Sequence, residues 1–124
     1  MPMERRPIMH IDIPSADPVA TGNFYSMLFN WEVKHEPTFT WFSTGNIGGG
    51  LPDLSNGLHP VVDVMKAGDV MLYVPSDDID TDLRRVVELG GKVLVPKTKA
   101  GEGHWVAIFA DPNGVRIGLS SGNG

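Results

Sequence analysis

A histidine and an aspartate stand two residues apart in the segment HIDIPS, at His10 and Asp12. Alternate residues of a β-strand point to the same side, so a strand here would place both side chains opposite Ile11. Imidazole titrates near neutral pH, and a histidine beside a carboxylate can serve as a general base. Residues two apart on one strand are too widely spaced to assure a hydrogen bond. The pair is therefore equally consistent with a structural network in which His10 bonds Asp12 or Tyr73.

A glycine occupies an unexpected place near the end of the chain. The segment FADPNGVRIGLSS predicts two strands joined by a type I turn over residues 111–114. In the second strand, Arg116 and Gly118 fall on one face, and Ile117 and Leu119 on the other. A glycine inside a strand weakens it, because it has no side chain to pack. Gly118 therefore needs a structural or functional reason.

Composition and missing motifs exclude several kinds of chemistry. The chain has 124 residues and no cysteine, which excludes disulfides, thiolate metal ligands and a thiol nucleophile. A formal charge of −5 and the lack of a basic patch argue against binding to nucleic acid or to an anionic membrane. Neither Gly-x-Ser-x-Gly nor His-Glu-x-x-His occurs, and no Gly-Lys-Ser/Thr follows the glycine run at 48–50. With no visible signal peptide or membrane span, the sequence predicts a cytoplasmic protein.

The elements that must position these residues occur twice. The segment HIDIPSADP, from His10, matches MLYVPSDDI, from Met71, at an offset of 61 residues without a gap. Each copy reads as a short strand, a Pro-Ser-x-Asp corner, a helix and further strands. The sequence therefore predicts an α+β fold of two tandem βαβββ modules. Their expected bounds are about 8–51 and 69–121, with a linker at 52–68, in one domain spanning 1–124.

Two helices are expected, near residues 18–29 and 79–89. Asp17 and Asp78 have the side chains of good N-caps. An apolar side chain recurs every four residues along the first helix and predicts a stripe packed into the core. The stripe consists of Ala20, Phe24 and Leu28.

This tandem arrangement resembles the vicinal oxygen chelate superfamily, which includes glyoxalase I, the extradiol dioxygenases and the bleomycin-resistance proteins. The resemblance covers about residues 9–121 and is most specific in HIDIPSADP…FYSMLFNWEV, DDIDTDLRRVVELGGKV and FADPNGVRIGL. The segments IGGGL, VPKT and HWVAIFADPNG look like a glyoxalase-related subgroup whose members are mostly of undefined activity. The resemblance implies that the two modules form a curled sheet, or cup, with the helices outside.

The resemblance also implies where a metal site would lie. In the metal-dependent members, ligands come from the first and last strand of each module; here those positions are His10, residues 48–50, Met71 and Gly118. A divalent metal needs three or four N, O or S donors, which this set does not supply. No metal and no other cofactor is therefore expected. Gly118 stands where family metalloenzymes place a carboxylate, so we expect it to leave the cup wider at that point.

The lining of the cup follows from strand alternation. Met71 and Tyr73 are expected to face the cup, because Leu72 and Val74 are expected in the core. Trp41 or Phe42, and Trp105, are candidate walls, although the sequence does not decide which face of its strand Trp105 takes. A cup with apolar and aromatic walls and a few polar groups is typical of a small-molecule site. The candidate ligand-binding residues are His10, Asp12, Trp41, Met71, Tyr73, Trp105, Arg116 and Gly118.

Three functions are consistent with this interpretation. The first is a protein that binds a small organic molecule in the cup without the family metal. The second is a lyase, isomerase or dioxygenase of the superfamily that uses a non-standard metal set or His10 as a general base. The third is a non-catalytic subunit that binds a partner protein. Resemblance to small two-module members, and strand edges that need cover, also predict a homodimer.

Overall fold

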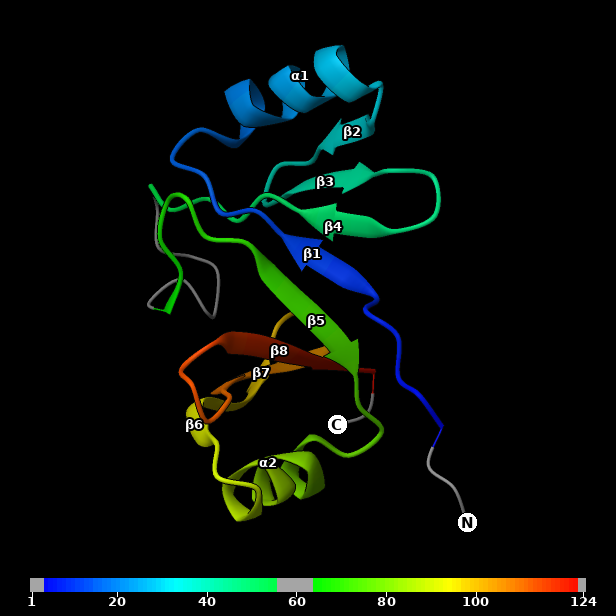
Figure 1. Cartoon of the computed structure of the whole chain (residues 1–124). Coiled ribbons are helices and arrows are strands. Elements are labelled where there is room, and N and C mark those ends of the chain that lie inside the picture. The colour runs from blue at the N-terminus through cyan, green and yellow to red at the C-terminus, as the bar shows by residue number, and fades with distance from the viewer. Residues whose placement is uncertain (1–3, 56–63, 123–124) are drawn as a thin grey trace. The chain divides into compact units, whose positions relative to one another are not determined.

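The computed structural model describes residues 4–55 and 64–122 of the chain (Figure 1). It divides into two compact units, His10–Met71 and Leu72–Gly124, the second of which also includes Met1–Met9. Residues 56–63, within the predicted linker, lie outside the described residues. No helix among the described residues is long and apolar enough to cross a membrane.

The first unit is a four-stranded sheet with one helix. Its sheet order is β2-β3-β4-β1, in which β1 and β4 are parallel and the other neighbours are antiparallel. The helix α1 packs against β2 and β3. The elements are β1 (His10–Asp12), α1 (Pro18–Phe29), β2 (Glu32–His35), β3 (Thr40–Ser43) and β4 (Gly48–Gly50).

The second unit repeats this plan. Its sheet order is β5-β8-β7-β6, with β5 and β8 parallel, and α2 packs against β6, β7 and β8. The elements are β5 (Met71–Pro75), α2 (Ile79–Glu88), β6 (Lys92–Lys99), β7 (Trp105–Ala110) and β8 (Arg116–Ser121). The predicted α+β fold with two βαβββ modules is therefore confirmed, as are both helices.

The internal repeat extends to side-chain contacts at the corner before each helix. Ser15 Oγ lies 2.7 Å from Thr21 Oγ1, and Ser76 Oγ donates to Asp82 Oδ2 at 2.6 Å. Both pairs join residues six apart, and they are related by the same offset of 61 residues. The Pro-Ser-x-Asp corner is therefore one local structure that the chain uses twice.

The predicted burial of the stripe on α1 is wrong. Phe24 and Leu28 are each 59% exposed. The buried residue of the helix is Gly22, where an added Cβ would lie 2.8 Å from Val33 Cγ1 on β2. The helix meets the sheet through this glycine, because a missing side chain lets the two backbones approach closely. The apolar stripe exists, but it faces away from the sheet.

The core of the second unit lies between α2 and its sheet. Four buried residues form its centre: Ile79, Leu83, Ala107 and Leu119. The side chains of Val74, Val93, Trp105 and Phe109 pack against them. Val74, which strand alternation places in the core, therefore packs against it as expected.

The turn before β8 also forms as predicted. The N–H of Gly114 donates to the carbonyl oxygen of Asp111 at 2.9 Å, and the Asp111 side chain accepts from Asn113 N at 2.8 Å. Gly114 has φ +91°, a left-handed conformation that favours glycine. Sequence chemistry alone therefore determines this turn.

An N-terminal segment, which we call the strap (residues 4–9), completes the second unit. The two terminal nitrogens of Arg6 donate to the two carboxylate oxygens of Asp82 at 2.6 and 3.0 Å. The N–H of Met9 donates to the carbonyl oxygen of Tyr73 at 2.9 Å. The strap is thus held to both α2 and β5.

This ion pair should make stability depend on pH. The hydrogen bond from Arg6 is the main cause that lowers the pKa of Asp82; the Ser76 bond and the Arg6 charge add to it, and burial opposes it. A carboxylate with a lowered pKa in the folded state stabilises above its unfolded pKa, about 3.9, and loses that effect as the pH falls further. We expect Asp82→Asn to cost about 1 kcal/mol at pH 7, in line with a partly exposed pair.

Urea unfolding between pH 7 and pH 2.5 tests this expectation. The difference between wild type and Asp82→Asn should shrink as the pH falls below about 3.9, because the unfolded state then binds a proton that the folded state binds only at lower pH. Arg6→Gln is the matched control and should show the same loss at pH 7. A difference that stays constant over the whole pH range would contradict the assignment.

Candidate functional site

The clearest chemical pair of the first unit is His10 with Asp12 on β1. His10 Nε2 lies 2.6 Å from Asp12 Oδ1, so the strand does bring together the two groups that their spacing alone could not assure. An ionised carboxylate only accepts hydrogen bonds, so Nε2 donates. The Asp12 side chain is 3% exposed, whereas the His10 side chain is 26% exposed. A buried carboxylate therefore orients an imidazole that solvent can reach.

Aromatic rings stand beside this pair. The Trp41 ring centroid lies 6.4 Å from that of His10 in an edge-to-face arrangement, and Trp41 is 43% exposed. Phe39 packs against Trp41 at 4.5 Å. Phe39 was not among the residues predicted to line the site, although its alternation with Trp41, two residues on, indicates that both rings share one face.

The glycines of β4 shape the surface next to the pair. Gly50 is the strand neighbour of Asp12 and of Trp41, and a Cβ there would overlap the Phe39 ring and lie 3.1 Å from Asp12 Oδ1. Gly48 is the neighbour of His10, and a Cβ there would meet only a backbone oxygen, at 3.6 Å. The glycine at 50 is thus required by packing, whereas the position of Gly48 would accept a Cβ with only an ordinary contact.

In the second unit, three of the predicted residues lie on two neighbouring strands. Tyr73 pairs directly with Gly118, and a Cβ on Gly118 would overlap the Tyr73 ring. Tyr73 is 2% exposed, and so is Met71, the residue of β5 that ends the first unit. Arg116 shares the Gly118 side of β8 and is half-buried. The expectation that Gly118 widens a pocket is corrected: its missing side chain makes room for the tyrosine ring.

Trp105 lies on the other face of this sheet, away from Tyr73 and Gly118. Ala107 pairs with Leu119 and, together with it, packs beneath α2. Trp105 packs against that same cluster, and Lys97 Nζ lies 5.2 Å from its ring centroid. Trp105 therefore occupies the helix-facing side of the sheet, opposite the face that carries Gly118.

The residues at the family's metal positions do not fit a divalent ion. Of His10, Gly48–Gly50, Met71 and Gly118, only the imidazole is a strong donor; the thioether is soft and the glycines offer no side chain. Across residues 4–55 and 64–122, no group of three or more His, Asp or Glu side chains could hold a metal ion.

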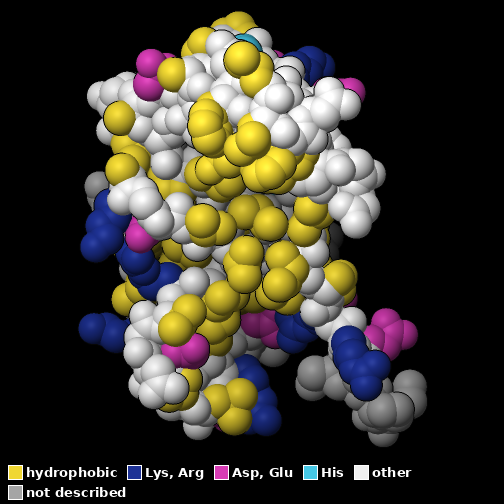
Figure 2. All heavy atoms as spheres, turned by 45° about the horizontal axis from the view of Figure 1, so that its top comes forward, with side chains coloured by type: hydrophobic (Ala, Val, Ile, Leu, Met, Phe, Trp, Pro, Cys, Tyr) yellow, Lys and Arg dark blue, Asp and Glu magenta, His cyan; other side chains and the backbone are white. Residues whose placement is uncertain are grey.

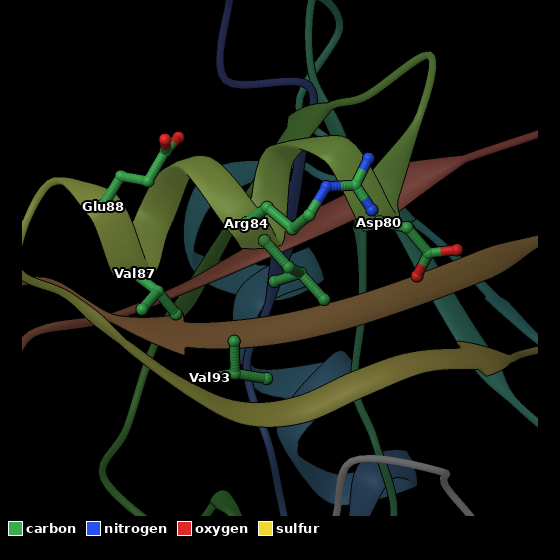
Figure 3. A pocket seen from close by; sticks show the side chains of 6 residues that line it. Asp80, Arg84, Val87, Glu88 and Val93 are labelled. Atoms are coloured by element: carbon green, nitrogen blue, oxygen red, sulfur yellow. The ribbon is translucent and has the colours of Figure 1, made fainter.

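Two hollows flank α2 in the second unit. The wider, of about 690 Å³, opens between the helix and β6. Figure 3 shows Val87 and Val93 pointing toward each other there, while Glu88 points away from the strands. The narrower, of about 340 Å³, has the Arg6–Asp82 ion pair in its lining. Their charged groups lie at exposed positions or in ion pairs, so His10 and Asp12 remain the better candidate for chemistry.

Comparison with known protein families gives a match that covers most of the chain. A model described as the glyoxalase/bleomycin resistance protein/dioxygenase superfamily matches residues 8–119. The chain is 25% identical to the Mycobacterium bovis protein named "Putative glyoxylase CFP32", over 91% of the chain and 44% of the relative. The chain thus spans less than half the length of that curated relative.

Solved structures show the same fold. A hypothetical protein from Bacillus halodurans C-125 is similar with a TM-score of 0.72 and 15% identity, over 95% of each chain. A Streptomyces coelicolor methylmalonyl-CoA epimerase variant, in complex with 2-nitronate-propionyl-CoA, has a TM-score of 0.61 and 20% identity, over 92% of this chain and 95% of the epimerase. At these identities the likeness concerns the fold alone.

Proposed function

The chain belongs to the glyoxalase/bleomycin resistance protein/dioxygenase superfamily, and from that premise we propose that it binds a small organic molecule against His10, Asp12 and Trp41, without the family's metal. The observation that carries the proposal is a partly exposed imidazole that a buried carboxylate orients, next to a glycine, Gly48, whose position would accept a Cβ with only an ordinary contact. Trp41, nearly half exposed, supplies an apolar wall. This combination of one polar anchor and an aromatic surface is typical of small-molecule sites.

The chemistry of these groups limits the ligand. The exposed part of the imidazole can contact a polar group of a ligand, and the Trp41 ring can stack on a planar or apolar group. A neutral or weakly polar molecule with a carbonyl group next to an apolar part satisfies both. We also propose that the protein forms a homodimer and does not bind nucleic acid.

Trp41 and Trp105 provide a matched pair of variants for the test. We expect a binding compound, found by screening small neutral carbonyl compounds with an apolar or aromatic part, to quench tryptophan fluorescence in wild type. The quenching should persist in Trp105→Phe, whose ring faces α2, and be lost in Trp41→Phe. His10→Ala should weaken binding about tenfold, the worth of one hydrogen bond of about 1.4 kcal/mol. Quenching that depends on Trp105 instead would refute the site.

A second candidate function is catalysis with His10 as the general base. The observation that favours it is the hydrogen bond to Asp12, which would make Asp12 a positioning residue and hold the imidazole in one tautomer. The imidazole would take a proton from the carbon next to a ligand carbonyl, and the electron pair would move to the carbonyl oxygen.

Proton exchange separates binding from catalysis. If His10 acts as a base, the bound compound should take up deuterium from D2O at that carbon, as measured by NMR. His10→Gln should abolish the exchange, and Asp12→Asn should slow it and shift its pH profile. A compound that binds but never exchanges would leave the protein a binding protein.

A further inference from the structure

The narrower hollow beside α2, which we call the α2–strap hollow, lies wholly within the second unit. Its volume is about 340 Å³, and its walls come from α2, the strap, three strands and the turn after β7. Figure 2 shows, in the lower part of the molecule where α2 lies, hydrophobic side chains next to charged ones of both signs. The apolar part of the lining consists of Val74, Val86, Leu89, Phe109, Pro112 and Leu119.

The floor of the hollow belongs to the hydrophobic core. Val74 and Phe109 pack against the buried cluster beneath α2, yet both side chains are only half-buried. Leu119, a member of that cluster, also contributes to the lining. The helix thus leaves part of the core uncovered, and a small molecule that enters the hollow would remove this apolar surface from water. The volume falls within the usual range for ligand pockets.

The walls of the hollow are held in place by the protein itself. Arg6 is fixed by two hydrogen bonds to Asp82, at 2.6 and 3.0 Å. At Gly91, an added Cβ would lie 2.7 Å from Val86 Cγ1 and 2.8 Å from the carbonyl oxygen of Ala110, so glycine lets the end of α2 approach β7 closely. A preformed pocket loses less conformational entropy when a ligand binds.

The charged groups of the lining differ in their capacity for a further partner. Arg6 and Asp82 pair with each other, and Asp111 Oδ1 accepts from two backbone N–H groups at 2.8 and 3.0 Å. The Arg85 side chain is 62% exposed, and its Nη1 lies 3.8 Å from Glu88 Oε1, which is beyond hydrogen-bond distance. A guanidinium has five N–H donors. Arg85 is therefore the group of this lining that is best able to bind an anion.

We propose that the α2–strap hollow binds a small amphiphilic carboxylate, with its apolar part on Val74 and Phe109 and its carboxylate at Arg85. A water molecule occupies about 30 Å³, so the volume of about 340 Å³ corresponds to roughly eleven waters. A ligand of about ten non-hydrogen atoms, such as an eight-carbon aliphatic acid, has this size. His10 and Trp41 belong to the other unit, so the proposal does not depend on the ligand site of the proposed function.

Octanoate and octanamide are matched probes, because they have the same chain and differ in charge. In an NMR titration of the whole protein at pH 7, octanoate should shift the methyl signals of Val74, Val86, Leu89 and Leu119. We expect a dissociation constant on the order of 1 mM or lower. Octanamide should bind about fivefold more weakly, because it lacks the charge that meets an exposed arginine. Butyrate, which is four methylene groups shorter, should bind more than about tenfold more weakly.

Two neighbouring arginines of α2 provide matched variants. Arg85 lines the α2–strap hollow, whereas Arg84 lines the wider hollow on the other side of the helix. Arg85→Gln should weaken octanoate binding about fivefold and leave octanamide binding unchanged, while Arg84→Gln should change neither. Both positions are exposed, so both variants should fold, and urea unfolding verifies this.

Three results would overturn the proposal. They are octanoate titration without shifts of these methyl signals, octanamide binding as tight as that of octanoate, and octanoate affinity that Arg85→Gln leaves intact. His10→Ala should leave octanoate binding unchanged while it weakens binding of the neutral carbonyl compound at the other site. The two binding proposals can therefore fail separately.

Discussion

Replacing Gly49 with alanine should lower the free energy of unfolding by about 3 kcal/mol, the upper part of the usual range for overpacking. The new Cβ would overlap the Phe42 ring and, more seriously, the carbonyl oxygen of Ile11 on the neighbouring strand. A ring can turn, but a backbone oxygen in a ladder cannot move without separating β1 from β4. The substitution should therefore disturb the strand that carries His10.

Gly48, the residue before Gly49, provides the matched control. A Cβ at Gly48 meets only the Phe42 carbonyl oxygen, at 3.6 Å, which is an ordinary contact. Gly48→Ala should change the free energy of unfolding by less than about 1 kcal/mol and tend to stabilise, because alanine loses less backbone entropy on folding. The same variant should weaken ligand binding, since it fills the space beside His10. Equal urea midpoints for the two alanine variants would contradict the packing described for β4.

Gly118→Ala is the second variant with a large expected effect, about 2 kcal/mol. Its Cβ would overlap the ring of Tyr73, which is 2% exposed and has little room to move. Gly118→Glu should cost more than alanine, because it places a carboxylate in a buried position as well. Urea unfolding of the two variants beside wild type measures both losses.

A double-mutant cycle shows whether Tyr73 is the cause. Tyr73→Ala alone should be destabilising, because it removes a buried ring. In that background, Gly118→Ala should cost almost nothing, since the atoms that it overlaps are gone. If Gly118→Ala costs the same with and without the ring, the backbone at Gly118 and not the ring requires glycine.

Those parts of the fold that depend only on residues close together in the sequence were predictable. Asp17 and Asp78 accept hydrogen bonds from the third residue after them, as N-caps do, and the Asp111 turn needs only its own four residues. The burial of α1 was not predictable in this way. A periodicity shows that a stripe exists, whereas the choice of buried side depended on Gly22, a residue that adds nothing to a hydrophobic pattern.

The candidate site was predictable to the same extent. Strand alternation placed His10 and Asp12 on one face, but the 2.6 Å contact depends on side-chain conformations that alternation does not determine. The reasons for glycine at positions 50 and 118 were likewise not predictable from the sequence. Tyr73 covers Gly118, and Phe39 covers Gly50, because of the register between strands, which short segments do not specify.

The strap has a consequence for the order in which the chain can fold during synthesis. Arg6 and Asp82 are 76 residues apart, so Arg6 leaves the ribosome roughly 4 to 15 s before its partner at ordinary translation rates. The first unit, which is continuous from His10 to Met71, is complete within that interval, while the nine residues ahead of it wait for α2. A cut between residues 9 and 10 should accordingly weaken the unit that begins beyond residue 71 and spare the one beside the cut.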